Sequence, residues 1–123
     1  PMSIKVLLID DELKFVSTLS ERLEIRGYTS KFSISGEEGL EQIASFSPDV
    51  VISDVIMPGL SGFDVLKALR KIAPTVPVIL LTGHSSTQDG MKGMELGAFD
   101  YIIKPVDIEE LVEKINLSLK VKK

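Results

Sequence analysis

Short apolar stretches recur along the chain, and each is followed by a segment in which apolar residues return with helical spacing. Within the stretches, apolar residues fill consecutive positions, as in Val-Leu-Leu-Ile and Val-Ile-Leu-Leu. Strands that are buried on both faces have this pattern, which is typical of a parallel sheet covered by helices. The expected strands are Val6–Ile9, Tyr28–Phe32, Val50–Ser53, Val78–Thr82 and Tyr101–Ile103.

The segments between these strands carry the signals of amphipathic helices. An apolar face recurs from Leu13 to Leu23, and Gly27 follows it as a C-terminal stop. Ser35 and Glu38 have the spacing of a capping box, which opens the second helix. The later helices are expected from Ser35 to about Ser45, from Gly62 to Ile72, from about Ser86 to Leu96 and from Asp107 onward.

The fourth expected helix is the weakest of the five. Gly90 and Gly93 lie inside it, and each interior glycine costs about 1 kcal/mol relative to alanine. We therefore expect this helix to move more readily than the others. Met91 and Met94 share its helical spacing and are interpreted as core residues.

Strands and helices alternate with a regular period. The expected strands end at residues 9, 32, 53, 82 and 103, which leaves room for one helix and two loops between each pair. This repetition predicts an α/β fold in which five helices surround a doubly wound, five-stranded parallel sheet. A length of 123 residues fits one domain over 1–123. Pro1, ahead of Met2, is interpreted as a cloning remnant.

Composition and charge exclude several classes of function. With no cysteine and one histidine, the chain offers no disulfide framework, no thiolate metal site, no cysteine nucleophile and no zinc site of several histidines. The net charge of −4 provides no general basic surface for nucleic acid or anionic membranes. No apolar run approaches the roughly 18 residues of a membrane-spanning helix. We expect a soluble, cytoplasmic domain that does not itself bind nucleic acid or membranes.

Polar side chains gather where the expected strands end. The carboxylates Asp10 and Asp11 follow the first strand, and Asp54 follows the third. Thr82 ends the fourth strand, and Lys104 follows the fifth. In an open parallel sheet, ligands bind beyond the carboxyl ends of the strands. We therefore expect these side chains to share one edge of the sheet and to form the functional site.

This set of side chains suits phosphoryl chemistry with a divalent cation. Carboxylates that lie close together repel one another unless a proton or a cation joins them. Oxygen ligands without histidine or cysteine favour a hard cation such as Mg²⁺, which binds carboxylates together with phosphate oxygens. An aspartate can act as the nucleophile and form an aspartyl phosphate, while a lysine and a hydroxyl contact the phosphoryl oxygens. Glu12 is interpreted only as an acid that complements a helix dipole.

Four segments at the strand ends form a specific pattern. They are Val-Leu-Leu-Ile-Asp-Asp-Glu (6–12), Asp-Val-Ile-Met-Pro-Gly-Leu-Ser-Gly (54–62), Leu-Thr-Gly (81–83) and Gly-Ala-Phe-Asp-Tyr-Ile-Ile-Lys-Pro (97–105). In this order, the segments closely resemble the receiver domain of bacterial two-component response regulators. The resemblance covers essentially the whole chain, and it implies a flavodoxin-like sheet with the strand order 2-1-3-4-5.

The resemblance also implies roles for the acidic residues. Asp54 would be the phosphoacceptor of the domain. Asp10 and Asp11 would hold Mg²⁺ beside it, with Asp11 as a direct ligand. Asp54 itself and the main-chain carbonyl of Ile56 would complete the ligands that the protein provides.

The remaining roles concern transfer and response. Thr82 and Lys104 would contact the phosphoryl group, and the Lys104–Pro105 peptide bond would be cis. A sensor histidine kinase or a histidine phosphotransfer domain would donate the phosphoryl group. Tyr101 fits either a core aromatic residue or the rotating switch residue of the family. As a switch, it would alter the face of the fourth helix, fifth strand and fifth helix, which would contact an output domain or a second copy.

The lifetime of the phosphorylated state is expected to depend on Ile56 and His84. In the resembling family, side chains at these two positions flank the approach of the water that hydrolyses the acyl phosphate. Ile56 has no polar atom to hold such a water, and its branched side chain shields the phosphoryl group. We therefore expect slow dephosphorylation, with His84 able either to obstruct the water or to orient it.

Two other functions are compatible with parts of the pattern. An aspartyl-nucleophile phosphohydrolase would place a second acid two residues after the nucleophile, where this chain has Ile56. An interaction module that works without phosphorylation would usually lose the acidic pair, the acceptor or the lysine, and none is lost here. We therefore expect a signalling domain, not an enzyme, that promotes only its own phosphorylation and dephosphorylation.

Overall fold

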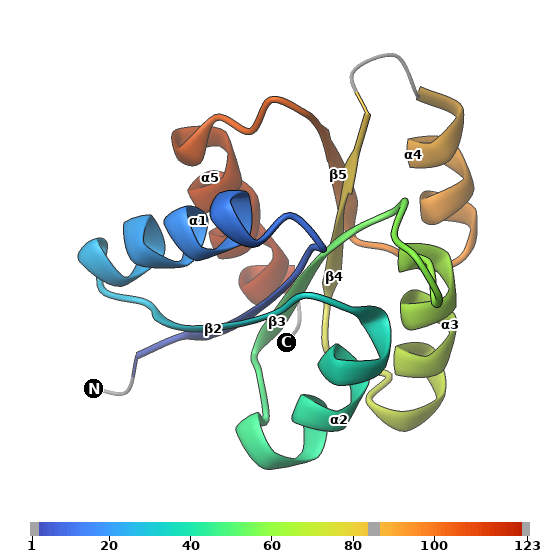
Figure 1. The fold of residues 1–123 in the computed structure, drawn as a ribbon, viewed down its shortest axis with the longest axis horizontal. Helices are drawn as coiled ribbons and strands as arrows, with labels where there is room; N and C mark the ends of the chain where they lie inside the picture. The colour runs from blue at the N-terminus through green and yellow to red at the C-terminus, as the bar shows by residue number, and fades with distance from the viewer. Residues whose placement is uncertain (1–2, 84–86, 122–123) are drawn as a thin grey trace.

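Five parallel strands form one sheet, and helices cover both of its faces (Figure 1). The computed structural model describes residues 3–83 and 87–121. The strand order is β2-β1-β3-β4-β5, which confirms the expected doubly wound α/β fold. The strands are β1 Lys5–Ile9, β2 Thr29–Ser33, β3 Val50–Asp54, β4 Val78–Thr82 and β5 Asp100–Ile103.

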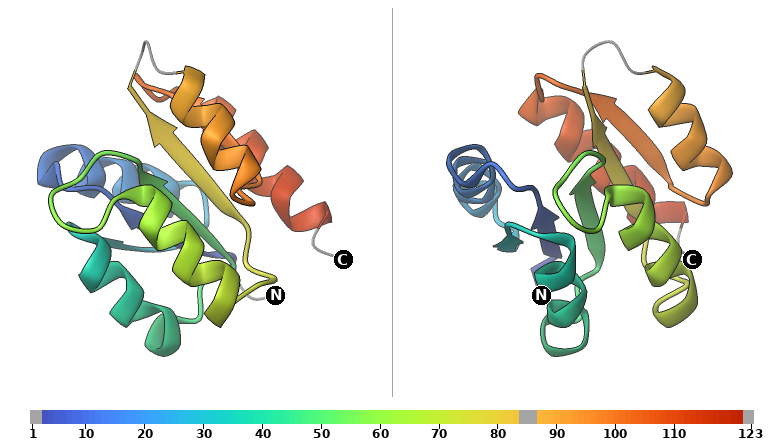
Figure 2. Two further views of the ribbon diagram at one scale, coloured as in Figure 1. Left: turned by 90° about the vertical axis from the view of Figure 1, so that its right-hand side faces the viewer. Right: turned by 45° about the vertical axis from the view of Figure 1, so that its right-hand side comes forward.

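The helices divide into two layers, one on each face of the sheet. They are α1 Leu13–Ile25, α2 Gly36–Phe46, α3 Gly62–Ile72, α4 Thr87–Glu95 and α5 Ile108–Val121. As Figures 1 and 2 show, α1 and α5 cover one face, whereas α2, α3 and α4 cover the other. Within the described ranges, no helix is both long and apolar enough to cross a membrane.

The central strands supply side chains to two separate cores. In β1, Val6 and Leu8 pack with the helices α1 and α5, whereas Leu7 and Ile9 pack with α2 and α3. Strands β3 and β4 are buried at every position. Successive side chains of a strand point to opposite faces, and here both faces are covered. This arrangement explains why the apolar residues of the strands are consecutive.

Strand β2 begins and ends one residue later than the pattern predicts. The pattern predicts Tyr28–Phe32, but the strand spans Thr29–Ser33. The backbone N–H of Tyr28 donates to the carbonyl of Leu23 in α1 (3.1 Å), so it closes the helix instead of pairing in the sheet. The side chain of Tyr28 is nevertheless part of the core under α1 and α5, and this burial resembles the start of a strand.

The inner face of α4 is made of glycine. Met91 and Met94 are 63% and 44% exposed, so the prediction that they pack in the core is wrong. Gly90 and Gly93 are instead the buried residues of the helix. A Cβ atom at Gly90 would lie 2.4 Å from the ring of Tyr101, and Gly93 approaches β4 as closely. The two glycines therefore allow α4 to pack directly on the sheet.

N-terminal caps fix where α2 and α3 begin, and a glycine lets α3 begin close to β3. In α2, the backbone N–H of Glu38 donates to Ser35 Oγ (3.1 Å), as their spacing predicts. In α3, Ser61 and Asp64 form a reciprocal capping box. A Cβ atom at Gly62 would lie 2.3 Å from a backbone oxygen at the end of β3. Because glycine has no Cβ, α3 begins directly against β3 and fixes the loop between them.

Candidate functional site

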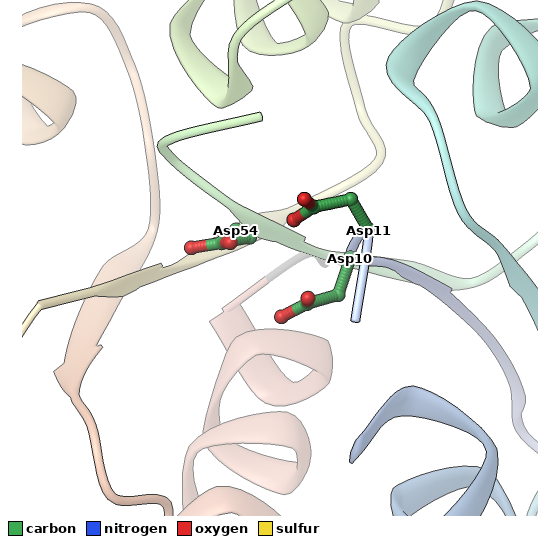
Figure 3. Close-up of side chains that lie close together, drawn as sticks. All are labelled: Asp10, Asp11 and Asp54. Atoms are coloured by element: carbon green, nitrogen blue, oxygen red, sulfur yellow. The ribbon is translucent and has the colours of Figure 1, made fainter. Parts of the chain in front are cut away.

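The predicted polar residues meet at the carboxyl edge of the sheet. Asp10 and Asp11 immediately follow β1, and Asp54 is the last residue of β3. Thr82 is the last residue of β4, and Lys104 immediately follows β5. Strands β1, β3, β4 and β5 are consecutive neighbours in the sheet, so their ends lie side by side. Figure 3 shows the three aspartate side chains close together, with their carboxylates turned to the same side.

The three aspartates form a set of oxygen donors. One carboxylate oxygen from each of Asp10, Asp11 and Asp54 lies within 4.8 Å of the others. Asp10 and Asp54 are buried, whereas Asp11 is exposed to solvent. Hard divalent cations prefer such oxygen-only ligands, and adjacent buried carboxylates are stabilised by a cation between them. The donor set therefore fits Mg²⁺, with Asp11 on the side that solvent reaches.

Lys104 partly neutralises these acids. Its Nζ donates a hydrogen bond to Asp10 Oδ2 at 3.0 Å and lies 3.6 Å from Asp54 Oδ2. The same Nζ lies 3.4 Å from Oε1 of Glu12. The sequence predicts Glu12 only as a partner of a helix dipole, because nothing in the local pattern pairs it with a residue 92 positions away. Glu12 is therefore a member of the site that sequence reasoning misses.

Burial and mutual repulsion disturb the ionisation of the buried groups. Burial raises the pKa of Asp54 to about 6, the charges of Asp10 and Asp11 add to this rise, and Lys104 opposes it. Burial also raises the pKa of Asp10, against its hydrogen bonds from Glu12 and Lys104. Burial lowers the pKa of Lys104, but its hydrogen bond with Asp10 and the nearby carboxylates outweigh burial and raise the pKa overall. The charged acids therefore favour a further cation at this edge.

Thr82 contributes a buried hydroxyl group to the site. The residue is 1% exposed, and its Oγ1 has no hydrogen-bond partner within the described part of the chain. The carbonyl of Thr82 accepts the backbone N–H of Lys104 at 2.8 Å, so the two residues are joined through the backbone. A buried hydroxyl without a partner is unfavourable. A ligand that brings an acceptor oxygen to this edge would satisfy it.

The other predicted residues lie around this centre. Ile56, in the loop after β3, is 71% exposed. Tyr101, the second residue of β5, is half-buried, and its ring packs on α4 at Gly90. The Lys104–Pro105 peptide bond is cis, which is the geometry that the resemblance implies. His84 lies outside the described residues.

Comparison with known proteins decides which family this site represents. The family model of the response regulator receiver domain matches residues 6–116. The chain belongs to the response regulator receiver family. It is therefore a receiver domain, the phosphoacceptor module of two-component signal transduction.

Curated relatives contain this receiver domain as one part. The domain is 42% identical over 115 residues to YkoG of Bacillus subtilis, an uncharacterized transcriptional regulatory protein, and the match covers 94% of the chain and 50% of YkoG. It is 36% identical over 119 residues to the response regulator MprA of Mycobacterium ulcerans, covering 97% of the chain and 51% of MprA. The chain thus spans about half the length of these relatives.

Solved structures have the same fold. A response regulator receiver domain from Clostridium thermocellum matches with a TM-score of 0.91 and 40% identity, and the match covers 97% of this chain and 96% of that one. NtrX from Brucella abortus, crystallised with ADP, matches with a TM-score of 0.93 over 98% of this chain and 28% of its own. At 24% identity, the likeness to NtrX concerns the fold alone.

Proposed function

We propose that Asp54 accepts the phosphoryl group and that Mg²⁺ is held by Asp10, Asp11, Asp54 and the main-chain carbonyl of Ile56. The observation that carries this proposal is a cluster of three carboxylates, within 4.8 Å of one another, beside the ammonium of Lys104. The pattern combines an anionic nucleophile, oxygen ligands for a hard cation and a fixed positive charge. Aspartyl phosphate formation requires these three components.

The hydrogen bonds of the cluster support Asp54 as the nucleophile. Both carboxylate oxygens of Asp10 accept hydrogen bonds, one from the backbone N–H of Glu12 (2.9 Å) and one from Lys104 (3.0 Å). Such a carboxylate is fixed in place, which suits a metal ligand. Asp54 Oδ2 lies 3.6 Å from Lys104, so this oxygen is held less tightly. Asp54 also ends β3, which lies between β1, the strand that precedes the acidic pair, and β4, the strand that ends at Thr82.

The donor that we propose is the phosphohistidine of a sensor kinase or a phosphotransfer domain. A carboxylate oxygen of Asp54 forms the new P–O bond while the P–N bond breaks, and the imidazole leaves with the electron pair of that bond. When bound, Mg²⁺ supplies positive charge that offsets the carboxylates and the phosphoryl oxygens. Lys104 contacts one phosphoryl oxygen as a charged donor, and the Thr82 hydroxyl donates to another.

Thr82 and Tyr101 are proposed to transmit the phosphorylation of Asp54 to helix α4. The buried Thr82 hydroxyl has no partner among the described residues, so a phosphoryl oxygen on Asp54 would draw it toward the site. The ring of Tyr101 would then turn into the space that Thr82 leaves. Because this ring rests on α4 at Gly90, its rotation would change how α4 packs on β5. The two packings are the two states that phosphorylation biases.

The partner of the switched face is proposed to be an output domain or a second copy of the chain. This face consists of α4, β5 and α5. The relatives YkoG and MprA are about twice as long as this chain, and YkoG is called a transcriptional regulatory protein. This length supports an additional segment that responds to the receiver domain. We propose that the chemistry of the domain itself is to gain and lose its own phosphoryl group.

Labelling with a small phosphodonor tests the acceptor. The domain would be incubated with an acyl phosphate and Mg²⁺, and the added mass would be located by peptide mapping. We expect one labile phosphate on Asp54 and none on the Asp54→Asn variant, since an amide is a poor nucleophile of nearly the same shape. Asp89→Asn, which alters an aspartate of α4 outside the site, should be labelled normally. Undiminished labelling of Asp54→Asn would reject Asp54 as the acceptor.

Ile56 is proposed to prolong the phosphorylated state. Its side chain is 71% exposed in the loop after β3 and offers no hydrogen bond to an attacking water. Ile56→Asn should therefore lose phosphate faster than the wild type, which is measured as the decay of label at one Mg²⁺ concentration. An unchanged decay rate would show that Ile56 does not shield the acyl phosphate. The related role predicted for His84 concerns a residue outside the described ranges.

A further inference from the structure

The ammonium of Lys104 lies over the face of an aromatic ring as well as beside carboxylates. Its Nζ is 4.7 Å from the ring centroid of Phe15, in the first turns of α1. The face of a phenyl ring carries negative electrostatic potential and attracts a cation at this distance. Phe15 is thus a fourth partner of Lys104, after Asp10, Glu12 and Asp54.

The ring differs from the carboxylates in one respect that concerns the reaction. Asp10 and Asp54 are needed for the proposed metal and for the phosphoryl group, so their hold on Lys104 must weaken when the site is loaded. The phenyl ring has no charge, binds no metal and takes no proton. Its attraction for the ammonium depends on proximity to the ring face and tolerates small displacements of Nζ. The contact with Phe15 can therefore persist while Lys104 exchanges a carboxylate for a phosphoryl oxygen.

The position of the ring is fixed by packing. Phe15 is half-buried and packs against the core that α1 and α5 share. The ring is therefore held from behind by the core and presents its face to Lys104.

We propose that Phe15 is a positioning residue for the phosphorylation of Asp54: its ring retains the ammonium of Lys104 at the site when Asp10 and Asp54 are otherwise engaged. The inference rests on the proposed function, in which Lys104 contacts the phosphoryl group. A residue that served only to fill the core would be replaced by leucine without an effect on Lys104. The experiments therefore compare Phe15→Leu, which removes the ring, with Phe15→Tyr, which keeps it.

The contact itself is measured in the metal-free protein by NMR. Protons above an aromatic ring resonate upfield, so the ε-methylene protons of Lys104 should be shifted upfield relative to those of exposed lysines. The shift should disappear in Phe15→Leu and remain in Phe15→Tyr. Equal Lys104 shifts in the wild type and in Phe15→Leu would overturn the proposal, whatever the labelling shows.

The consequence is measured as the rate of labelling by the small acyl phosphate, which needs no partner protein. We expect Phe15→Leu to be labelled about two- to fivefold more slowly, the range that corresponds to an exposed cation–π contact. Phe15→Tyr should be close to the wild type. Phe63→Leu is the matched control, because the ring of Phe63 lies under Lys92, also at 4.7 Å, and should leave the rate unchanged.

A double variant separates positioning from a structural effect. If Phe15 acts through Lys104, Phe15→Leu should not slow labelling further in a Lys104→Ala background. An equal slowing in both backgrounds would overturn the inference and leave Phe15 as a core residue. Normal labelling of Phe15→Leu, with Asp54→Asn unlabelled, would overturn the inference alone. Failure of the wild type to be labelled would reject the proposed function and, with it, this role of Phe15.

Discussion

Asp54 is a carboxylate that the fold holds in an unfavourable environment. Burial, and then the neighbouring acids, raise its pKa from 3.8 to about 6. A group with a raised pKa in the folded state favours folding when it is protonated. That contribution is complete below pH 3.8 and is lost as the pH rises through about 6. The metal-free domain should therefore lose the stability that comes from Asp54 over this range.

Comparison of the wild type with Asp54→Asn at several pH values isolates the contribution of Asp54 to stability. The free energy of unfolding would be measured by urea denaturation in the presence of a chelator. Asp54→Asn should gain stability relative to the wild type as the pH rises from 3.8 to about 6, and the difference should then be constant. Asp64→Asn is the control of opposite sign: hydrogen bonds from Ser61 lower the pKa of Asp64, so this variant should lose stability relative to the wild type as the pH rises to 3.8 and show no further change above it. A difference that does not vary with pH would mean that Asp54 ionises normally.

Thr82 provides a second prediction for a single residue. Thr82→Val removes a buried hydroxyl that has no partner among the described residues, while the volume changes little. The metal-free variant should be as stable as the wild type or more stable by about 1 kcal/mol, because an unsatisfied polar group is lost. Labelling by the acyl phosphate should be slower, since a phosphoryl contact is missing. A clear loss of stability in urea denaturation would show that the hydroxyl has a partner in the resting state.

The effect of Gly90→Ala in helix α4 on stability depends on the neighbouring ring of Tyr101. In an unhindered helix, Gly90→Ala would be stabilising by about 1 kcal/mol. Here the new Cβ would lie 2.4 Å from the ring of Tyr101, so the ring or the helix must shift. We expect Gly90→Ala to destabilise the wild type but to stabilise a Tyr101→Ala background, as measured by urea denaturation. The same sign in both backgrounds would show that the ring does not occupy the space beside Gly90.

The same helix shows what a local pattern predicts and what it does not. Helical spacing places Met91 and Met94 on related positions of one helix, but it does not say which face points inward. The face with Gly90 and Gly93 packs on the sheet because it allows a closer approach. The displaced start of β2 has a similar origin, since Tyr28 is buried as in a strand while its backbone closes α1.

For the whole molecule, the sequence predicts the fold and most of the candidate site. Consecutive apolar residues predict buried parallel strands, and the polar residues that end these strands must meet at one edge. The contacts of Lys104 with Glu12 and Phe15 are not predicted, because they join α1 and its preceding loop to the end of β5. Such contacts depend on the exact position and orientation of a helix on the sheet, and the spacing of apolar residues in the sequence does not determine these.

The ion pair between Lys104 and Asp10 makes the lysine an intramolecular competitor of the metal. Lys104 holds its positive charge against the buried carboxylates that are proposed to bind Mg²⁺. Two unit charges about 4 Å apart repel by about 1 kcal/mol even in water-like surroundings, and by more at a protein surface. Lys104→Met should therefore bind Mg²⁺ about fivefold more tightly or better, as measured by titration at constant ionic strength. An unchanged affinity would mean that the lysine moves aside at no cost.

This competition affects how the domain behaves in a changing ionic environment. Without the lysine, the proposed site would fill at a Mg²⁺ concentration lower by the same factor as the gain in affinity. With the lysine present, a higher concentration of free Mg²⁺ would be needed to fill the proposed site. A cation that is part of the chain would thus set the Mg²⁺ concentration at which the proposed site fills and the domain becomes ready to react.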